Sequence, residues 1–135
     1  MVARIEAAQD AVPEHRGIVL SIFSAIAAGD FQALTQHFTS DAELNIYGFG
    51  PFNGCWCGRE DVLAAITTNF GKLASQTPVI EAMADQGDSF AIRIDESGLL
   101  KPDHRPYHLR GVIWFTFKGQ QVQRIHEFLH DEMAA

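Results

Sequence analysis

The sequence has little positive charge and little cysteine. Its 135 residues carry 10 Lys and Arg against 17 Asp and Glu, which gives a net charge of −7. This balance argues against a nucleic acid or an anionic membrane as a partner, because both bind basic surfaces. The two cysteines, Cys55 and Cys57, are separated only by Trp56. Two ligands cannot complete a structural zinc site and a Cys-x-Cys disulfide is strained, so we expect free thiols in a reducing cytoplasm.

Long apolar runs are also missing. The longest candidate, residues 18–28, is interrupted by two serines and is about half the length that a bilayer requires. Arg4, Glu6 and Asp10 fall within what would be the core of a signal peptide, so export is not indicated. A content of 47% hydrophobic and 20% charged residues is typical of a folded chain. We therefore expect a single domain over residues 1–135.

The spacing of apolar residues predicts two helices, a strand, a third helix and then a series of hairpins. Residues 1–12 are interpreted as a frayed lead-in or a short helix. The expected helices cover about 13–28, 31–38 and 59–73, and the expected strands cover 42–47, 78–84, 90–95, 107–117 and 122–130. Residues 48–58 hold four glycines and are expected to form a loop, either a mobile lid or a fixed surface loop. Residues 97–104 are expected to be a polar connection.

This order of elements predicts the α+β class, with three helices packed on one face of a curved, mostly antiparallel sheet. The segment from Tyr107 to Phe117 carries large apolar residues on both strand faces, because alternate side chains point in opposite directions. One face should be covered by helices. Val112, Trp114 and Phe128 fall on the other face, and such an exposed apolar band predicts a two-fold homodimer.

Three short segments carry a family resemblance. They are Ala28-Gly29-Asp30-Phe31, the Phe38–Ala42 turn, and a closing strand with Ile125-His126-Glu127-Phe128 after Gly119. The spacing of these three segments resembles that of the nuclear-transport-factor-two-like superfamily. Within it, the chain resembles the SnoaL-like branch related to ketosteroid isomerases. The resemblance implies a cystatin-like conical barrel, a pocket between helices and sheet, and commonly a dimer. Because this superfamily includes isomerases, polyketide cyclases, epoxide hydrolases and proteins that only bind ligands, it does not imply one activity.

The acid and base of ketosteroid isomerases are not matched. By this resemblance the tyrosine, the late-strand acid and the aspartate base of those enzymes correspond to Ile22, Ile113 and Ile46. None of these side chains can donate or accept a proton, so steroid isomerisation by that mechanism is not expected.

Epoxide hydrolases similar to limonene epoxide hydrolase offer a closer match. Their arginine and two acids correspond to Arg93, Asp95 and Glu127, although Leu44 and Ile46 replace the residues that help hold the attacking water. Two carboxyl groups near one arginine could transfer protons close to neutral pH. The alternative is a buried structural ion pair without catalytic function.

These observations leave two functional hypotheses. One is a cofactor-free isomerase, cyclase or hydrolase that acts on a small hydrophobic molecule through Arg93, Asp95 and Glu127. The other is a non-catalytic small-ligand-binding dimer of the same fold. In both cases we expect the ligand to contact an apolar set consisting of Ile22, Leu44, Ile46, Tyr107, Ile113, Phe115, Ile125 and Leu129.

The segment His126-Glu127-Phe128-Leu129-His130 spells the H-E-x-x-H signature of zinc proteases. That signature binds zinc on a helix, where residues four apart lie one turn apart. In a strand the two histidines would be about 13 Å apart and could not share an ion. We therefore expect no metal, and place both histidines on the outer face with Phe128.

Overall fold

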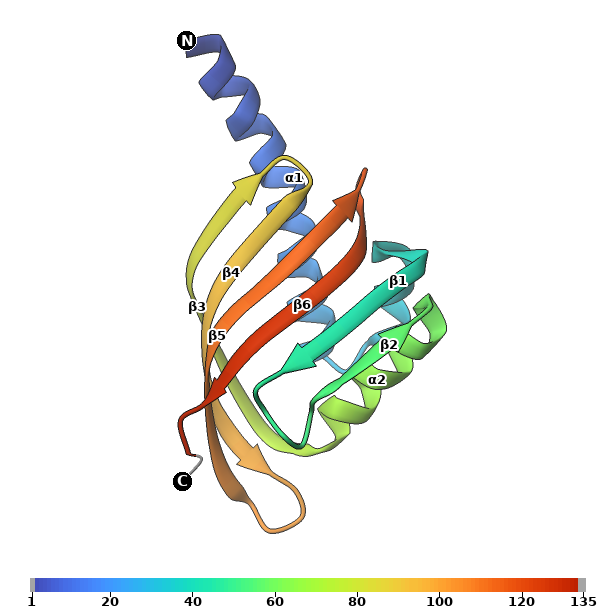
Figure 1. Cartoon of the computed structure of the whole chain (residues 1–135), viewed down its shortest axis with the longest axis vertical. Helices are drawn as coiled ribbons and strands as arrows, with labels where there is room; N and C mark the ends of the chain where they lie inside the picture. The colour runs from blue at the N-terminus through green and yellow to red at the C-terminus, as the bar shows by residue number, and fades with distance from the viewer. Residues whose placement is uncertain (1, 134–135) are drawn as a thin grey trace.

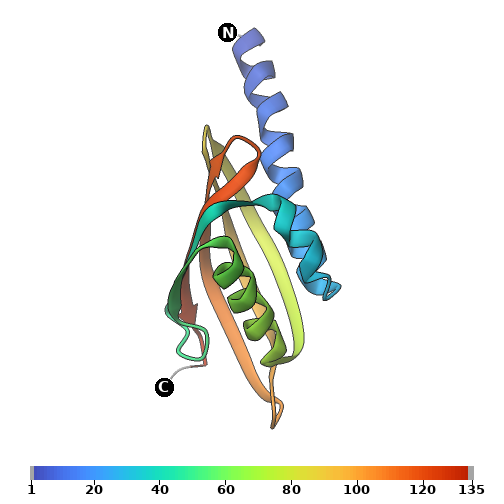
Figure 2. The ribbon, with the colours of Figure 1, turned by 90° about the vertical axis from the view of Figure 1, so that its right-hand side faces the viewer.

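The computed structural model describes residues 2–133, with side chains from residue 14 onward. It contains one six-stranded sheet with its helices on one side (Figures 1 and 2). The helices are α1 (Val2–Ala27), the short 3-10 helix η1 (Phe31–His37) and α2 (Arg59–Gly71). The strands are β1 (Phe38–Tyr47), β2 (Gly54–Cys57), β3 (Leu73–Gln86), β4 (Ser89–Leu100), β5 (Arg105–Lys118) and β6 (Gln121–Asp131). The expected α+β architecture is confirmed.

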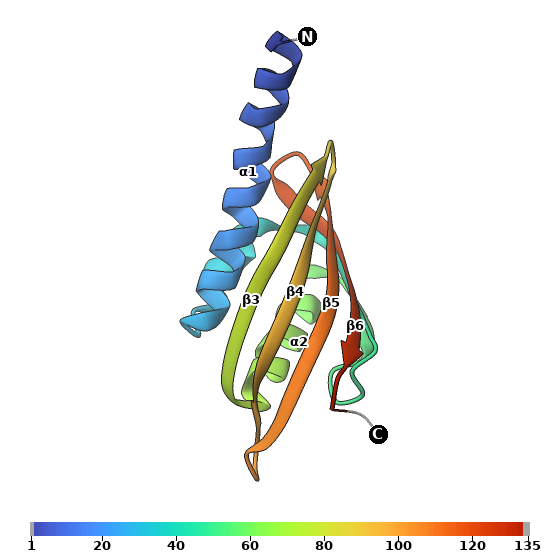
Figure 3. The same cartoon turned by 90° about the vertical axis from the view of Figure 1, so that its left-hand side faces the viewer.

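The strands lie in the order β2-β1-β6-β5-β4-β3, and every neighbouring pair is antiparallel except β1 and β6. Strand β1 therefore lies beside the last strand of the chain, and its side chains face the same cavity as those of the C-terminal hairpin. The long strands β3, β4 and β5 curve around the helices (Figure 3). A pocket lies between this curved sheet and the helical layer.

The hairpin turns were well predicted. Gly119 lies between β5 and β6 with φ of 62°, and Gly87 lies between β3 and β4 with the same φ. Glycine adopts this left-handed conformation without the steric cost that a Cβ atom would add, so both turns suit the residues that occupy them.

Several boundaries differ from the sequence-based expectation. Helix α1 begins at Val2 rather than near residue 13, and its first turns extend past the end of the sheet (Figure 1). Strand β1 begins at Phe38 rather than at residue 42. Strand β2 lies within the segment expected to be a loop, and β4 continues to Leu100 through half of the expected polar connection. Pairing with a neighbouring strand extended β1, β2 and β4, because hydrogen bonds between strands satisfy backbone N–H and C=O groups whatever the local sequence.

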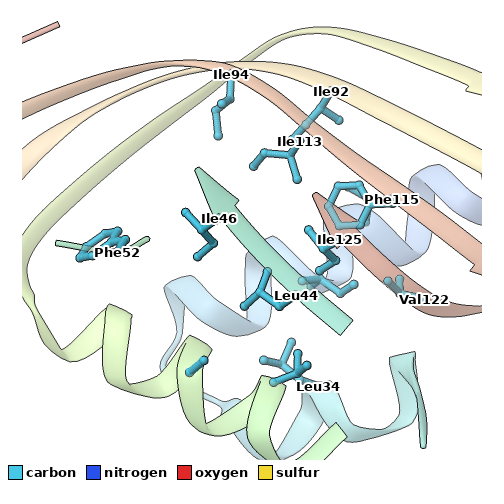
Figure 4. Close-up of a cluster of buried hydrophobic side chains, with 14 of the residues drawn as sticks. Leu34, Leu44, Ile46, Phe52, Ile92, Ile94, Ile113, Phe115, Val122 and Ile125 are labelled. Carbon is cyan, nitrogen blue, oxygen red and sulfur yellow. The ribbon is translucent and has the colours of Figure 1, made fainter. Parts of the chain in front are cut away.

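The core lies between the concave face of the sheet and the helices. Leu34 of η1, Leu44 of β1 and Phe115 of β5 are each at most 2% exposed. Figure 4 shows these side chains directed toward one another from separate elements, together with Ile94 and Ile125. Alternate residues of β4, β5 and β6 contribute to this core, as strand periodicity requires.

The loop between β1 and β2 is held by several contacts. The Lys72 ammonium donates a hydrogen bond to the carbonyl oxygen of Pro51 at 2.7 Å and lies 5.4 Å from the centre of the Phe52 ring. The backbone N–H of Phe49 donates to Asn53 Oδ1 at 2.9 Å. Phe49 and Phe52 are buried. Of the two expectations for this segment, these contacts favour the fixed loop.

Candidate functional site

A cavity of about 140 Å³ lies between the helices and the concave face of the sheet. Of the eight side chains expected to contact a ligand, seven line it: Ile22, Leu44, Ile46, Ile113, Phe115, Ile125 and Leu129. These belong to α1, β1, β5 and β6, so the cavity is built from both ends of the chain. The eighth, Tyr107, is 2% exposed and does not line the cavity. Its hydroxyl group instead donates a hydrogen bond to Glu96.

Glu127 of β6 lines this cavity. It pairs across the sheet with Ile46 of β1 and Ile113 of β5, so its nearest backbone neighbours in both adjacent strands carry apolar side chains. Removal from water, and secondarily the charge of Glu96, raise the pKa of Glu127 from 4.5 to about 7. No hydrogen bond contributes to this shift. Glu127 can therefore accept or release a proton near neutral pH.

A second carboxyl group, Glu96 of β4, also lines the cavity and is 8% exposed. The Tyr107 hydroxyl donates a hydrogen bond to Glu96 Oε2 at 2.7 Å, and Gln76 Nε2 donates to the same oxygen at 3.2 Å. Burial raises the pKa of Glu96, while the two hydrogen bonds oppose this effect. Burial and the neighbouring Glu96 also raise the pKa of Tyr107, so its phenol keeps its proton and remains a donor.

The two acids therefore differ in environment. Glu96 is held by two donors, whereas Glu127 is stabilised by none. Pairs of acids in unlike surroundings are typical of acid–base sites, because each group can then hold its proton over a different pH range.

Arg93 and Asp95 do not line this cavity, so the structure does not bring them together with Glu127 as the sequence had led us to expect. The Arg93 side chain is 61% exposed, and its Nε lies 3.4 Å from Glu81 Oε1. Asp95 contacts His108 Nε2 at 2.8 Å and Arg110 Nε at 3.3 Å. All of these groups lie on the outer face of the sheet, because Ile94 and Glu96 occupy the inward positions of β4. The buried ion pair considered as an alternative is excluded by the same placement.

Glu96 was missed although the sequence held a signal for it. Phe90, Ile92 and Ile94 alternate along the predicted strand, and continuing the same period by two residues reaches Glu96. The predicted strand ended at Asp95 and the predicted polar connection began at residue 97, so Glu96 was assigned to neither. The actual strand continues to Leu100.

Two further amides face the cavity, Asn69 of α2 and Gln76 of β3. Lys72 Nζ donates to Asn69 Oδ1 at 3.2 Å. Because an ammonium group can only donate, this contact fixes the amide oxygen of Asn69 toward Lys72 and leaves its NH₂ group available as a donor.

The remaining sequence-based expectations concern the outer surface. His126 and His130 lie on strand β6. The prediction that this segment is a strand, and not the helix that the zinc-protease signature requires, is therefore confirmed. His126 lies on the outer face, where its ring is 5.9 Å from that of Phe128. Within the described residues no three His, Cys, Asp or Glu side chains gather as a metal site. Cys55 and Cys57 are free and exposed on β2. No described helix is long and apolar enough to cross a membrane.

Comparison with known proteins agrees with this geometry. The family described as the SnoaL-like domain matches residues 19–125. The chain belongs to the SnoaL-like family. The match reaches every element that lines the cavity, but it ends at Ile125, before Glu127 and Leu129 of β6. No curated protein matches the sequence of this SnoaL-like protein.

Solved structures show the same fold at low sequence identity. An NTF2-like protein from Burkholderia xenovorans is 22% identical, with a TM-score of 0.73, over 86% of this chain and 88% of that chain. A candidate SnoaL-like polyketide cyclase from Jannaschia sp. is 17% identical, with a TM-score of 0.75, over 86% and 85%. A hypothetical protein with a ketosteroid isomerase-like fold from Catenulispora acidiphila, solved in complex with trimethylamine, is 16% identical, with a TM-score of 0.72, over 84% and 85%. At these identities the similarity shows the fold alone.

Proposed function

We propose that this SnoaL-like protein transfers a proton on a small apolar molecule, as an isomerase or cyclase, with Glu127 as the proton carrier. The observation that carries this proposal is the placement of Glu127 in an apolar cavity that raises its pKa to about 7. A carboxylate of this basicity can remove a proton from a carbon next to a carbonyl group and return it elsewhere on the same molecule. This chemistry requires no cofactor.

The other groups of the cavity fit supporting roles. Asn69 can donate its NH₂ group to an oxygen on which negative charge develops. Glu96, held by Tyr107 and Gln76, adds a second carboxyl group to the cavity. The Jannaschia protein of the same fold is described as a candidate polyketide cyclase, which would belong to this class of reaction. Epoxide hydrolysis through an arginine and an aspartate is not supported, because Arg93 and Asp95 lie outside the cavity.

The test uses substrates in which a carbon-bound proton is removed. Wild-type protein and Glu127→Gln would be assayed on β,γ-unsaturated ketones and on 5-nitrobenzisoxazole, whose ring opens with a colour change when a base removes its C–H proton. We expect the wild-type rate to rise with pH through about 7, where Glu127 ionises, and Glu127→Gln to lose about 10²–10⁴-fold.

Asp95→Asn is the matched control, since it removes a carboxylate from the same sheet on its outer face. It should retain the wild-type rate. An unchanged rate in Glu127→Gln on a substrate that the wild type converts would overturn the assignment of this residue.

The second candidate is a binding protein whose cavity holds a small apolar ligand without converting it. The observation that favours it is the composition of the lining, in which Asn69, Gln76, Glu96 and Glu127 are the polar members among 21 residues. Saturable binding of the ketones without turnover, in both wild type and Glu127→Gln, would support this alternative.

A further inference from the structure

The ionisable groups that line the cavity all have one sign. They are Glu96 and Glu127, and no lysine, arginine or histidine among the described residues lines it. Glu127 alone has no hydrogen-bond donor contributing to its pKa. When Glu127 ionises, the cavity acquires a negative charge in apolar surroundings, and none of the described residues that line it supplies a counterion. A buried charge of this kind is costly unless a partner of opposite sign is supplied.

The walls of the cavity also suit a positive charge. Four phenylalanine rings, Phe23, Phe52, Phe70 and Phe115, line it from α1, the β1–β2 loop, α2 and β5. The face of an aromatic ring attracts cations, most strongly where water is excluded. Phe52 already shows this property, because the Lys72 ammonium lies 5.4 Å from its ring centre.

The groups that face Glu127 come from every layer around the cavity. The adjacent strands supply Ile46 and Ile113, and the part of α1 whose side chains are described, from residue 14 onward, supplies only apolar side chains. Helix α2 supplies Asn69, which is polar but uncharged. Lys72, near the cavity wall, is engaged by Pro51 and Asn69, so Glu96 is the one other titratable group that lines the space with Glu127.

We infer that the cavity takes a small organic cation, an apolar amine in its protonated or quaternary form, whose positive charge is neutralised by Glu127. This inference rests on the proposed function in that it names the ligand class of the same cavity. A volume of about 140 Å³ is below the range typical of drug-sized ligands, which restricts the ligand to a small molecule. The ionised form of Glu127 repels carboxylate ligands, and the net charge of −7 favours the approach of cations.

The test compares two molecules of the same shape. Phenyltrimethylammonium carries a permanent positive charge, and tert-butylbenzene is its uncharged carbon isostere. Their affinities for wild-type protein would be measured by titration calorimetry at pH 5.5 and 8.5. We expect the affinity for phenyltrimethylammonium to rise about tenfold or more at the higher pH, because Glu127 is then ionised. The affinity for tert-butylbenzene should not rise.

Binding at pH 7 should also release protons, because the bound cation favours the ionised form of Glu127. This release is measured by repeating the titration in buffers with different ionisation enthalpies. Glu127→Gln should abolish both the proton release and the pH dependence, whereas Asp95→Asn should retain them. Equal or tighter binding of tert-butylbenzene by the wild type at pH 8.5 would overturn the inference, and so would a pH dependence that persists in Glu127→Gln.

The two proposals can fail separately. Loss of ketone or benzisoxazole turnover in Glu127→Gln supports proton transfer whatever the cavity binds. A missing preference for the cation, with turnover still dependent on Glu127, would overturn the ligand class and leave the proposed reaction standing.

Discussion

At the scale of single residues, Glu127 connects function with stability. Its carboxyl group has a pKa of about 7 in the folded chain and an ordinary value of 4.5 when exposed to water. Between these two pH values the unfolded chain loses a proton that the folded chain still holds. The free energy of unfolding must therefore decrease as pH rises across this window. At pH 8 this shift lowers the free energy of unfolding by about 3 kcal/mol relative to a carboxyl group whose pKa is not shifted.

Glu127→Gln should accordingly stabilise the protein while it removes the proton carrier. We expect the variant to unfold at a higher urea concentration than wild type at pH 8, and at a similar concentration at pH 4.5, where the wild-type carboxyl group is protonated. Urea unfolding across this pH range measures the difference. Glu132→Gln, at an exposed position, is the control and should track the wild type. Parallel curves for wild type and Glu127→Gln would contradict the raised pKa.

At the scale of elements, the sequence was most informative for the C-terminal hairpin. Its strands were expected at about 107–117 and 122–130, and β5 and β6 cover 105–118 and 121–131. The strong alternation and the Gly119 turn made this region clear. Strand β2 was missed because its residues lie in a glycine-rich segment, and only pairing with β1 makes them a strand.

Strand β4 depends on a glycine that allows close packing at its end. A Cβ atom at Gly98 would lie 2.2 Å from the backbone oxygen of Ser75 in β3 and 2.7 Å from the Tyr107 ring. Neither neighbour can yield without disturbing strand pairing or the hydrogen bond from Tyr107 to Glu96. The absence of a side chain at this position therefore helps to hold Glu96 in place.

We expect Gly98→Ala to destabilise the protein by about 1–3 kcal/mol through this overpacking. Gly17→Ala is the matched control, because a Cβ atom there meets nothing within 4 Å and the residue lies inside α1. That substitution should instead stabilise the helix by about 0.5–1 kcal/mol. Urea unfolding of both variants measures whether each substitution lowers or raises the free energy of unfolding. A neutral or stabilising Gly98→Ala would show that the contacts near Ser75 relax freely.

At the scale of the whole molecule, the outer face of the sheet carries an apolar band. Val112, Trp114 and Phe128 are 36%, 41% and 51% exposed, as the alternation of their strands predicted. The Tyr47 ring stacks on Phe128 with 5.6 Å between ring centres and extends the band to β1. Because exposed apolar surfaces of this kind are typical of interfaces, we propose that two copies of the chain associate through this face.

Phe128→Glu should convert such a dimer to a monomer, because it places a charge at the centre of an apolar interface. Sedimentation velocity at several protein concentrations would measure the change. Leu20→Glu is the control, since Leu20 is 38% exposed but lies on α1, away from the sheet face. The expected result is a dimer for wild type and Leu20→Glu and a monomer for Phe128→Glu. A wild type that sediments as a monomer would contradict the proposed association.

The sequence by itself determined the order of the elements apart from β2, the α+β class, and the two sets of side chains on β5 and β6, because apolar periodicity and turn residues are local properties. It also placed Glu127 with Ile125 and Leu129 on one face. The tertiary structure alone decided how far β4 extends. Phe90, Ile92 and Ile94 already mark the inner face in the sequence, but pairing with β3 and β5 carries the strand to Leu100 and so brings Glu96 to the cavity.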